Sequence, residues 1–327
     1  MDKKRIEEYQ QLLSAAKKEI SKVIIGLEEI IDDLLVSILN NGHVLLEGLP
    51  GLGKTLLVRT LSQVFALKYS RIQFTPDLMP ADITGTNILM EDTNGRRYFE
   101  FKKGPLFAQI ILADEINRAT AKTQSALLEA MQEQSITIAG ETYHLQNPFF
   151  VLATQNPLEL EGTYPLPEAQ LDRFFFKLKF GFPHLEELKV ILENTTSNTK
   201  VTLNHIIETN ELQKIQILIR EVPISSDVLD YAARMILATH PEMPEASPRV
   251  RKFIRYGASP RGGQALILGG KARSFMQGNY YVNFDDIRKV AIPALRHRII
   301  LNFEGEASGI KVEDLIKEII NEVPEKI

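Results

Sequence analysis

The segment GLPGLGKT at residues 48–55 constrains the fold of this chain more than any other stretch. It follows the short β-rich run VLLE and precedes KTLLVRTLSQVFAL, whose apolar positions repeat with helical spacing. Gly48, Gly53, Lys54 and Thr55 match the pattern G-x-x-x-x-G-K-[ST] of a phosphate-binding loop, which requires this strand–loop–helix order. The alternative, a glycine-rich turn that matches by accident, does not explain that order. The segment therefore predicts nucleotide binding.

The residue types of this loop suit phosphate groups. Glycines let consecutive backbone N–H groups turn toward the phosphates, and the following helix adds its positive amino-terminal end. We expect Lys54 to reach the β- and γ-phosphates and the Thr55 hydroxyl to ligate Mg²⁺. The residues of the loop expected to contact the nucleotide are Gly48, Leu49, Pro50, Gly51, Leu52, Gly53, Lys54, Thr55 and Leu56.

Apolar runs alternate with helical segments through the first part of the chain. The runs that read as buried strands are 44–47, 69–74, 108–115, 149–157 and 174–180. Such alternation indicates a parallel sheet covered by helices on both faces, the architecture of an α/β fold. Beyond Pro183 nearly every segment has helical periodicity instead. We therefore expect an α/β nucleotide-binding domain at residues 1–183 and a smaller all-α domain at residues 184–327.

Composition narrows the class of protein further. The chain of 327 residues has no cysteine, which excludes disulfides and thiolate metal sites. Its formal net charge of −4 argues against a broad nucleic-acid-binding surface. No apolar run reaches the length of a membrane span, and the amino terminus lacks an apolar signal core. Together these features predict a cytoplasmic protein without membrane insertion.

Two adjacent carboxylates, Asp114 and Glu115, end the apolar run IILADE. Beside a phosphate loop, Asp114 is placed to support Mg²⁺, and Glu115 is placed to polarise an attacking water. A solvated strand end is the alternative reading of such a pair. The combination with the phosphate loop favours hydrolysis of the nucleotide over transfer of its phosphoryl group to a metabolite.

With these residues in place, the sequence resembles the MoxR family of AAA+ ATPases. The matching segments are GLPGLGKT, ADEINRA, KTQSALLEAMQE, ATQNP, LPEAQLDRF and GASPR, in an order that matches from about residue 23 to residue 300. The resemblance implies an AAA+ core with a helical lid, ATP as the nucleotide and Mg²⁺ as its metal ion. It also places Gly26 on the adenine side of the site. Leu27 stands where the family often has glutamine.

The resemblance implies further roles for single residues. Asn156 falls at sensor 1, where an amide helps to hold the attacking water, although Asn-Pro is also a common turn. Arg173 matches the arginine finger that reaches the nucleotide of a neighbouring subunit, with a surface ion pair as the alternative. Arg261 matches sensor 2, expected on the nucleotide of its own subunit, unless its basic segment is simply solvated. Arg118 is a further candidate for a subunit interface.

Two hairpins are expected, one around Asn94-Gly95 and one at residues 135–147. In related proteins such hairpins line the pore or upper face of a ring, so that Phe99, Phe101, Lys102 and Lys103 are candidates to grip a client. Ordinary exposed hairpin faces are the alternative.

The family resemblance implies a ring of subunits, a hexamer in the commonest case. It also implies a chaperone-like role in the maturation of protein complexes, with partners that carry von Willebrand factor A domains. Two rival hypotheses are a nucleic-acid motor or loader and an ATP-bound scaffold that does not hydrolyse. The acidic charge balance weighs against the first, and the full set of catalytic candidates weighs against the second.

Overall fold

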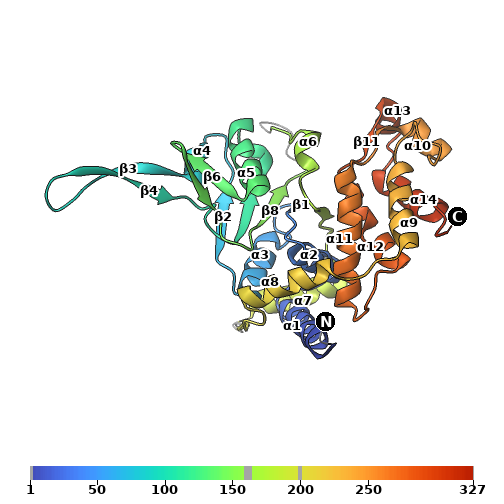
Figure 1. Cartoon of the computed structure of the whole chain (residues 1–327), viewed down its shortest axis with the longest axis horizontal. Coiled ribbons are helices and arrows are strands. Elements are labelled where there is room, and N and C mark those ends of the chain that lie inside the picture. The colour runs from blue at the N-terminus through green and yellow to red at the C-terminus, as the bar shows by residue number, and fades with distance from the viewer. Residues whose placement is uncertain (1–2, 158–163, 198–200, 327) are drawn as a thin grey trace.

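A computed structural model describes residues 3–157, 164–197 and 201–326, and Figure 1 shows its α/β part beside a group of C-terminal helices. At the centre lies a five-stranded parallel sheet in the order β2-β5-β8-β1-β9. Its strands are β1 (Val44–Glu47), β2 (Tyr69–Gln73), β5 (Ile110–Asp114), β8 (Phe150–Gln155) and β9 (Phe176–Lys179). Each lies within one of the five segments that were expected to be strands, which confirms the predicted parallel sheet.

Helices cover both faces of this sheet because its strands are apolar on both faces. In β5, Ile110 and Leu112 enter a core that they share with α1, α2 and α3, whereas Ile111 and Ala113 enter a second core with α5. The helices of this part are α1 (Lys3–Ser21), α2 (Glu28–Leu39), α3 (Lys54–Val64), α4 (Pro80–Thr84), η1 (Ile116–Arg118), α5 (Ala121–Glu133) and α6 (Glu168–Leu171).

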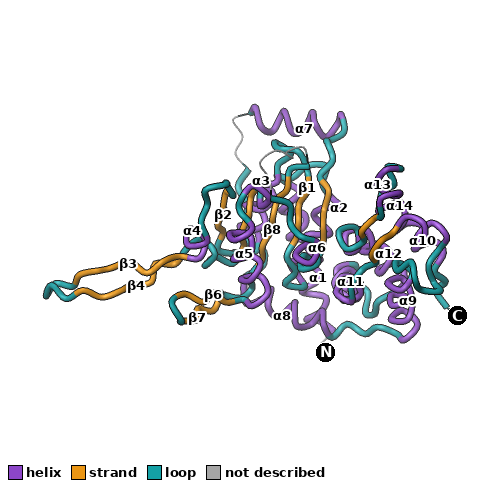
Figure 2. The backbone as a smooth tube through the Cα atoms, turned by 90° about the horizontal axis from the view of Figure 1, so that it is seen from above, coloured by secondary structure: helices purple, strands orange, loops and turns teal. Residues whose placement is uncertain are grey.

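Both predicted hairpins are present. The first pairs β3 (Gly85–Glu91) with β4 (Arg97–Lys103), and the second pairs β6 (Ser135–Ile138) with β7 (Glu141–His144). The β3–β4 hairpin projects far from the rest of the molecule (Figures 1 and 2). The aromatic rings of Phe101 and Tyr143 lie 4.2 Å apart, centroid to centroid, and connect the two hairpins. Phe101 is therefore packed at the base of its hairpin, whereas Phe99 is 73% exposed.

The C-terminal part is helical, as the sequence predicts. It contains α7 (Leu185–Thr196), α8 (Thr209–Arg220), α9 (Ser226–Leu237), α10 (Pro248–Phe253), α11 (Pro260–Met276), α12 (Phe284–Leu295), α13 (Phe303–Ala307) and α14 (Val312–Glu322). A small antiparallel pair, β10 (Ile254–Tyr256) and β11 (Ile300–Leu301), is the feature that helical periodicity did not predict. Across the described residues, no helix combines the length and apolarity needed to span a bilayer.

Helix α8 lies between the α/β part and the later helices. The Gln216 side chain donates a hydrogen bond of 2.8 Å to the carbonyl of Ile38 at the end of α2, and Ile215 belongs to the core that α2 and α3 share. Figure 2 shows α7 near the phosphate-loop end of the sheet and apart from α9–α14. The helical segment after residue 183 therefore has two parts in different places, and the boundary at residues 183–184 stays a prediction.

Candidate active site

The phosphate loop connects β1 to α3 and depends on its glycines for two different reasons. Gly51 and Gly53 have φ angles of 83° and 80°, in the left-handed region that side chains with a Cβ atom rarely adopt. Gly48 has a different constraint, because a Cβ atom there would lie 2.7 Å from the Cβ atom of Phe180 beyond β9. Gly53 caps α3, so that the first N–H groups of that helix open into the loop.

Lys54 begins α3 and turns its side chain back into the loop. Its Nζ donates a hydrogen bond of 2.6 Å to the carbonyl of Gly48. Partial burial lowers the pKa of Lys54, and the charges of Asp114 and Glu115 oppose this shift. The ammonium group therefore lies between the loop and the two carboxylates, where the phosphates of a nucleotide would offer it new acceptors.

Asp114 is held by contacts on both of its carboxylate oxygens. Thr154 of β8 donates its hydroxyl to Oδ1 at 2.7 Å, and the Arg71 guanidinium of β2 lies 2.7 Å from Oδ2. Parallel strands end at one edge of the sheet, which is why side chains from β2, β5 and β8 meet here. Arg71 supplies positive charge at the carboxylate that the sequence analysis assigned to Mg²⁺.

Glu115 adopts an unusual backbone conformation, with φ of 56° and ψ of 50°. A left-handed conformation is uncommon for a residue that is not glycine, and such residues are enriched at functional sites. The Glu115 backbone N–H donates to the Thr154 hydroxyl at 2.8 Å. Its Oε2 accepts hydrogen bonds of 2.8 Å from both Gln73 and Arg118. Two neighbours therefore hold the carboxylate, and Thr154 holds the backbone of the same residue.

The phosphate loop and the two carboxylates line one cavity of about 460 Å³. The structure brings together there the residues Pro50, Gly51, Gly53, Lys54, Thr55, Leu56, Asp114, Glu115 and Asn156. Asn156 lies directly after β8, beside the β1 end that leads into the loop. Within the described part of the chain, no three His, Asp or Glu side chains form a metal-binding group by themselves. A hydroxyl and a carboxylate that share Mg²⁺ with nucleotide phosphates are the donor set that this ion prefers.

A second cavity of about 680 Å³ adjoins the first, since Gly51, Gly53 and Leu56 line both. Gly26 and Leu52 line it together with residues of α7. Its largely aliphatic walls suit the flat apolar faces of a base. Gly48 and Leu49 belong to the loop but lie outside the linings of both cavities.

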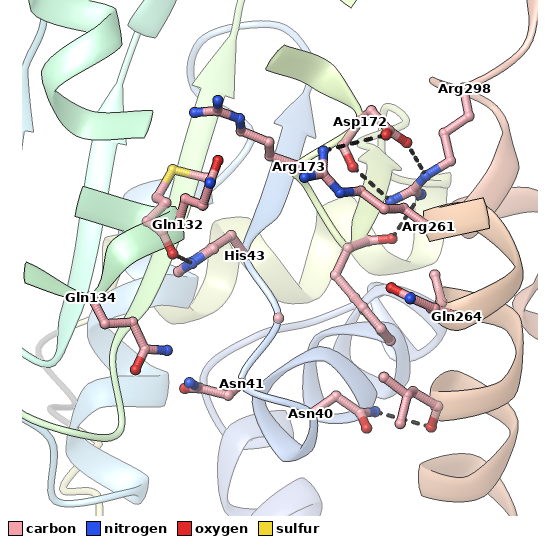
Figure 3. A pocket seen from close by; sticks show the side chains of 15 residues that line it. Asn40, Asn41, His43, Gln132, Gln134, Asp172, Arg173, Arg261, Gln264 and Arg298 are labelled. Carbon is pink, nitrogen blue, oxygen red and sulfur yellow. Dashed lines mark hydrogen bonds and ion pairs between the residues drawn. The ribbon is translucent and has the colours of Figure 1, made fainter. Parts of the chain in front are cut away.

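The two predicted arginines, Arg173 and Arg261, lie together in a different place. Both line a cavity of about 270 Å³, and none of the residues that line it belongs to the phosphate-loop cavity (Figure 3). Arg173 donates to the carbonyl of Leu128 at 3.2 Å, and Arg261 Nη1 lies 3.5 Å from Oδ2 of Asp172. The structure therefore does not bring the arginines to the phosphate loop of their own chain.

Asp172 and Arg298 fix the position of this arginine pair. The Arg298 side chain is only 3% exposed, and its Nε lies 2.9 Å from Oδ1 of Asp172. Asp172 also accepts hydrogen bonds of 2.8 and 2.9 Å from the hydroxyl of Ser259, which caps α11. Burial lowers the pKa of Arg298 to about 10, and the charge of Asp172 opposes this shift. Arg298 stays a cation at neutral pH and joins the lid to the segment that carries Arg173.

Five residues described above were not predicted as site residues from the sequence: Arg71, Gln73, Thr154, Asp172 and Arg298. Arg71 and Gln73 alternate along YSRIQF, and this period of two was a signal that both side chains share one face. Thr154 interrupts the apolar run FFVLAT, which was a weaker signal. Asp172 and Arg298 gave no signal, because their pairing joins positions 126 residues apart.

Comparison with protein-family models gives two matches. Residues 43–176 match the ATPase family associated with various cellular activities (AAA), and residues 246–319 match the AAA lid domain. The first segment contains strands β1, β2, β5 and β8 of the sheet and both carboxylates. The second contains α11 and α12, together with Arg261 and Arg298. The matches confirm the predicted fold class, an AAA+ core followed by a helical lid.

Whole-length relatives agree with these matches. The chain is 40% identical to Chaperone MoxR1 of Mycobacterium tuberculosis over 95% of this chain and 81% of that protein. It is 29% identical to Protein MoxR of Paracoccus denitrificans, with 88% of each chain covered. A solved structure from Cytophaga hutchinsonii superposes with a TM-score of 0.90 at 42% identity, over 98% of this chain and 97% of that one.

Proposed function

The chain belongs to the MoxR family of AAA+ ATPases, and on that premise we propose that it binds ATP with Mg²⁺ and hydrolyses it to ADP and phosphate. The observation that carries this proposal is the cavity that joins the phosphate loop to Asp114, Glu115 and Asn156. The base of ATP would occupy the adjoining cavity beside Gly26, and its phosphates would lie against Lys54.

Thr55 and Asp114 would hold Mg²⁺, which when bound neutralises phosphate charge and polarises the γ-phosphoryl group. For this, Asp114 exchanges its contact with Arg71 for the metal ion, while Thr154 keeps the other oxygen in place. The Arg71 guanidinium, released from Asp114, retains its hydrogen bond of 2.6 Å to Gln73. The positive charge of Arg71 beside the Asp114 carboxylate would thus be replaced by that of Mg²⁺.

Glu115 acts as the base that receives a proton from the attacking water. Gln73 and Arg118 both contact Oε2, so we assign the water to Oε1. The water oxygen bonds to the γ-phosphorus, the bond from that phosphorus to the bridging oxygen breaks, and ADP leaves with the bridging oxygen's electron pair. Asn156 lines the same cavity, and we assign its amide to the orientation of the water.

The arginines complete the site of a neighbouring subunit. Arg173 and Arg261 lie in a cavity separate from their own phosphate loop, so a second copy of the chain must present them to the γ-phosphate. This keeps the expected role of Arg173 and changes that of Arg261, which was expected on the nucleotide of its own subunit. Each subunit then holds one nucleotide and serves another, which a closed head-to-tail ring satisfies, and the family resemblance favours a hexamer.

A mixing experiment tests this shared site. Glu115→Gln should bind ATP without hydrolysing it, and Arg173→Ala should lose most hydrolysis, since an arginine finger contributes roughly 10³- to 10⁵-fold in rate. In an equal mixture of the two variants, roughly one site in four combines an intact Glu115 with an intact neighbouring Arg173. Phosphate release should therefore return after subunit exchange. A mixture as inactive as its parents, with exchange shown by fluorescence transfer, would rule out the shared site.

The cellular role that fits these features is the remodelling or maturation of protein complexes in the cytoplasm, as a chaperone-like ring. One relative of this chain is named Chaperone MoxR1. The exposed Phe99 of the β3–β4 hairpin offers a contact for a client protein, including one with a von Willebrand factor A domain. A nucleic-acid motor would instead show ATPase stimulation by DNA that falls steeply with added salt. Phosphate release measured with and without DNA at two salt concentrations separates the two roles.

A further inference from the structure

The backbone of Glu115 needs support from its surroundings, because it holds a conformation that residues with a Cβ atom rarely adopt. Its φ of 56° and ψ of 50° lie in the left-handed region. Such a conformation persists only where neighbouring groups fix it. The Thr154 hydroxyl accepts a hydrogen bond from the Glu115 backbone N–H and so fixes the residue where it leaves β5. The turn that follows, residues 116–119, is fixed by a different side chain.

That side chain is Gln124, which lies near the start of α5 and is only 1% exposed. Its Nε2 donates to the carbonyls of Ile116 and Ala119, each at 3.1 Å, and so spans the turn η1 directly after Glu115. It also donates to the carbonyl of Tyr164 at 2.9 Å. Three carbonyl oxygens surround this nitrogen, and its two hydrogens are shared among them.

Tyr164 extends this clamp to the segment between β8 and α6. Its backbone N–H donates to the carbonyl of Asn117 at 2.7 Å, while its own carbonyl accepts from Gln124. Tyr164 is therefore held to the turn after Glu115 by both of its backbone polar groups. One buried amide joins the turn that follows the base to the segment that follows β8.

Removal of this amide would leave three carbonyls in a buried site with one donor fewer. A buried carbonyl without a donor is costly, so the turn would move toward other donors or toward water. Such a movement would shift the backbone of Glu115 and, with it, the direction of the carboxylate. A misplacement of a reacting group by about 1 Å can lower a rate by about 10²-fold.

We propose that Gln124 is a positioning residue for hydrolysis, which holds the left-handed turn of Glu115 so that the carboxylate is aimed at the attacking water. Gln124 lies outside the lining of the phosphate-loop cavity, so it acts through Glu115 and not on the nucleotide. This inference rests on the proposed hydrolysis and adds a residue outside its cavity. The turnover number kcat depends on Gln124, whereas ATP binding does not.

The variant Gln124→Met tests this role, because methionine keeps most of the side-chain volume and has no donor. Its kcat should fall by about 10²-fold. Its Kd for a fluorescent ATP analogue should stay within about twofold of wild type. The matched control is Thr123→Val, since Thr123 is the preceding residue of α5, is fully buried and donates its hydroxyl at 2.6 Å to the carbonyl of Leu78. This control also loses a buried hydrogen bond but keeps the turn, so its kcat should stay within about threefold of wild type.

A second measurement separates the positioning of Glu115 from a general loosening of the fold. In Glu115→Gln the base is already absent, so the further change Gln124→Met should lower the residual single-turnover rate by less than about threefold. The same change in the wild-type background should cost about 10²-fold. Equal losses in the two backgrounds would overturn the inference. So would a kcat of Gln124→Met that matches the kcat of Thr123→Val.

Gln124→Asn carries the same test if Gln124→Met does not fold, because it keeps a buried amide and shortens the side chain by one methylene. The shorter amide cannot reach all three carbonyls, so kcat should fall in the wild-type background and stay unchanged in Glu115→Gln. A Gln124→Asn protein as active as wild type would overturn the inference. Full turnover in Glu115→Gln would instead overturn the proposed base. Loss of turnover there, with fully active Gln124 variants, overturns the role of Gln124 and keeps the proposed function.

Discussion

Replacement of Arg298 by methionine removes a buried charge at the junction between the lid and the α/β part. Arg298 donates to the carboxylate and carbonyl of Asp172, and to the carbonyls of Phe174 and Phe175 at 2.7 and 3.2 Å. It also contacts the carbonyl of Ala294 in α12. Methionine keeps most of the side-chain volume and loses every donor. The segment 172–175 then loses its buried cation and keeps the half-exposed Arg261, whose Nη1 lies 3.5 Å from Oδ2 of Asp172.

The expected loss of stability follows from these contacts. Hydrogen bonds to a charged group contribute about 1.5–3 kcal/mol each to the free energy of unfolding. The sum over all five bonds overstates the loss, because they share one guanidinium and their contributions are not additive. Removal of one partner from a buried pair costs about 3–5 kcal/mol. Asp172 keeps its hydrogen bonds from Ser259, so the cost should fall near 3 kcal/mol. For a chain of 327 residues that corresponds to a thermal midpoint lower by on the order of 4 °C.

Differential scanning calorimetry of wild type, Arg298→Met, Asp172→Asn and the double variant measures this coupling. The double variant should be less destabilised than the sum of the single variants, by about 1–3 kcal/mol. Arg298→Lys is the matched control, because it keeps the charge and loses the planar fork that reaches several acceptors. ATP binding at the phosphate loop should persist, while hydrolysis falls with the displacement of Arg173. A midpoint for Arg298→Met within about 1 °C of wild type would refute the reasoning.

Two further predictions concern the phosphate loop and a partly buried acid. Lys54→Ala should lose both ATP binding and hydrolysis, whereas Glu115→Gln should keep ATP binding and lose hydrolysis. Binding is measured with a fluorescent nucleotide and hydrolysis with a phosphate-release assay. Unchanged turnover in Glu115→Gln would contradict the assignment of Glu115 as the base. Burial raises the pKa of Asp33 from its ordinary value of 3.8 to about 7, against the opposing charges of Arg273 and Arg296. Between pH 3.8 and about pH 7, the Asp33 carboxyl is protonated in the folded state and ionised in the unfolded state. The free energy of unfolding should therefore fall as pH rises toward 7. Thermal midpoints from pH 5 to pH 8 should show Asp33→Asn without this decline, with a gain of at most ~4 kcal/mol at pH 8, and parallel curves would contradict it.

The sequence was sufficient to predict the sheet and the meeting of the phosphate loop with the two carboxylates in one cavity. The central strands β1, β5 and β8 are short apolar runs, because burial on both faces leaves them without polar alternation, whereas the edge strands β2 and β9 alternate. The phosphate loop, Asp114 and Asn156 each lie within or next to a strand end, so parallel strands bring them to one edge without further information. Local sequence is enough to predict which residues meet wherever parallel strands end at the same edge of a sheet.

The placement of Arg261 could not be predicted in the same way. Its position depends on the path of the chain through α8, which packs on α2 and leads the later helices away from α7. Helical periodicity predicts that these helices exist, but it does not say which neighbour each one packs against. Arg298 illustrates the same limit, since within ALRHRI it reads as an exposed cation and in the fold it is buried against Asp172.

The β3–β4 hairpin has the mechanical properties of a lever. Its fulcrum is the contact between Phe101 and Tyr143. The segment after Phe101 leads through β5 to Asp114, and the segment after Tyr143 leads through β8 to Thr154. About six residues separate Phe101 from the turn at Gly95, or about 20 Å at ~3.4 Å per residue. A tilt of about 10° at the fulcrum then sweeps the tip through about 3.5 Å, from that same arm length. A small rotation at the base of the hairpin therefore becomes a displacement of several ångströms at its exposed end.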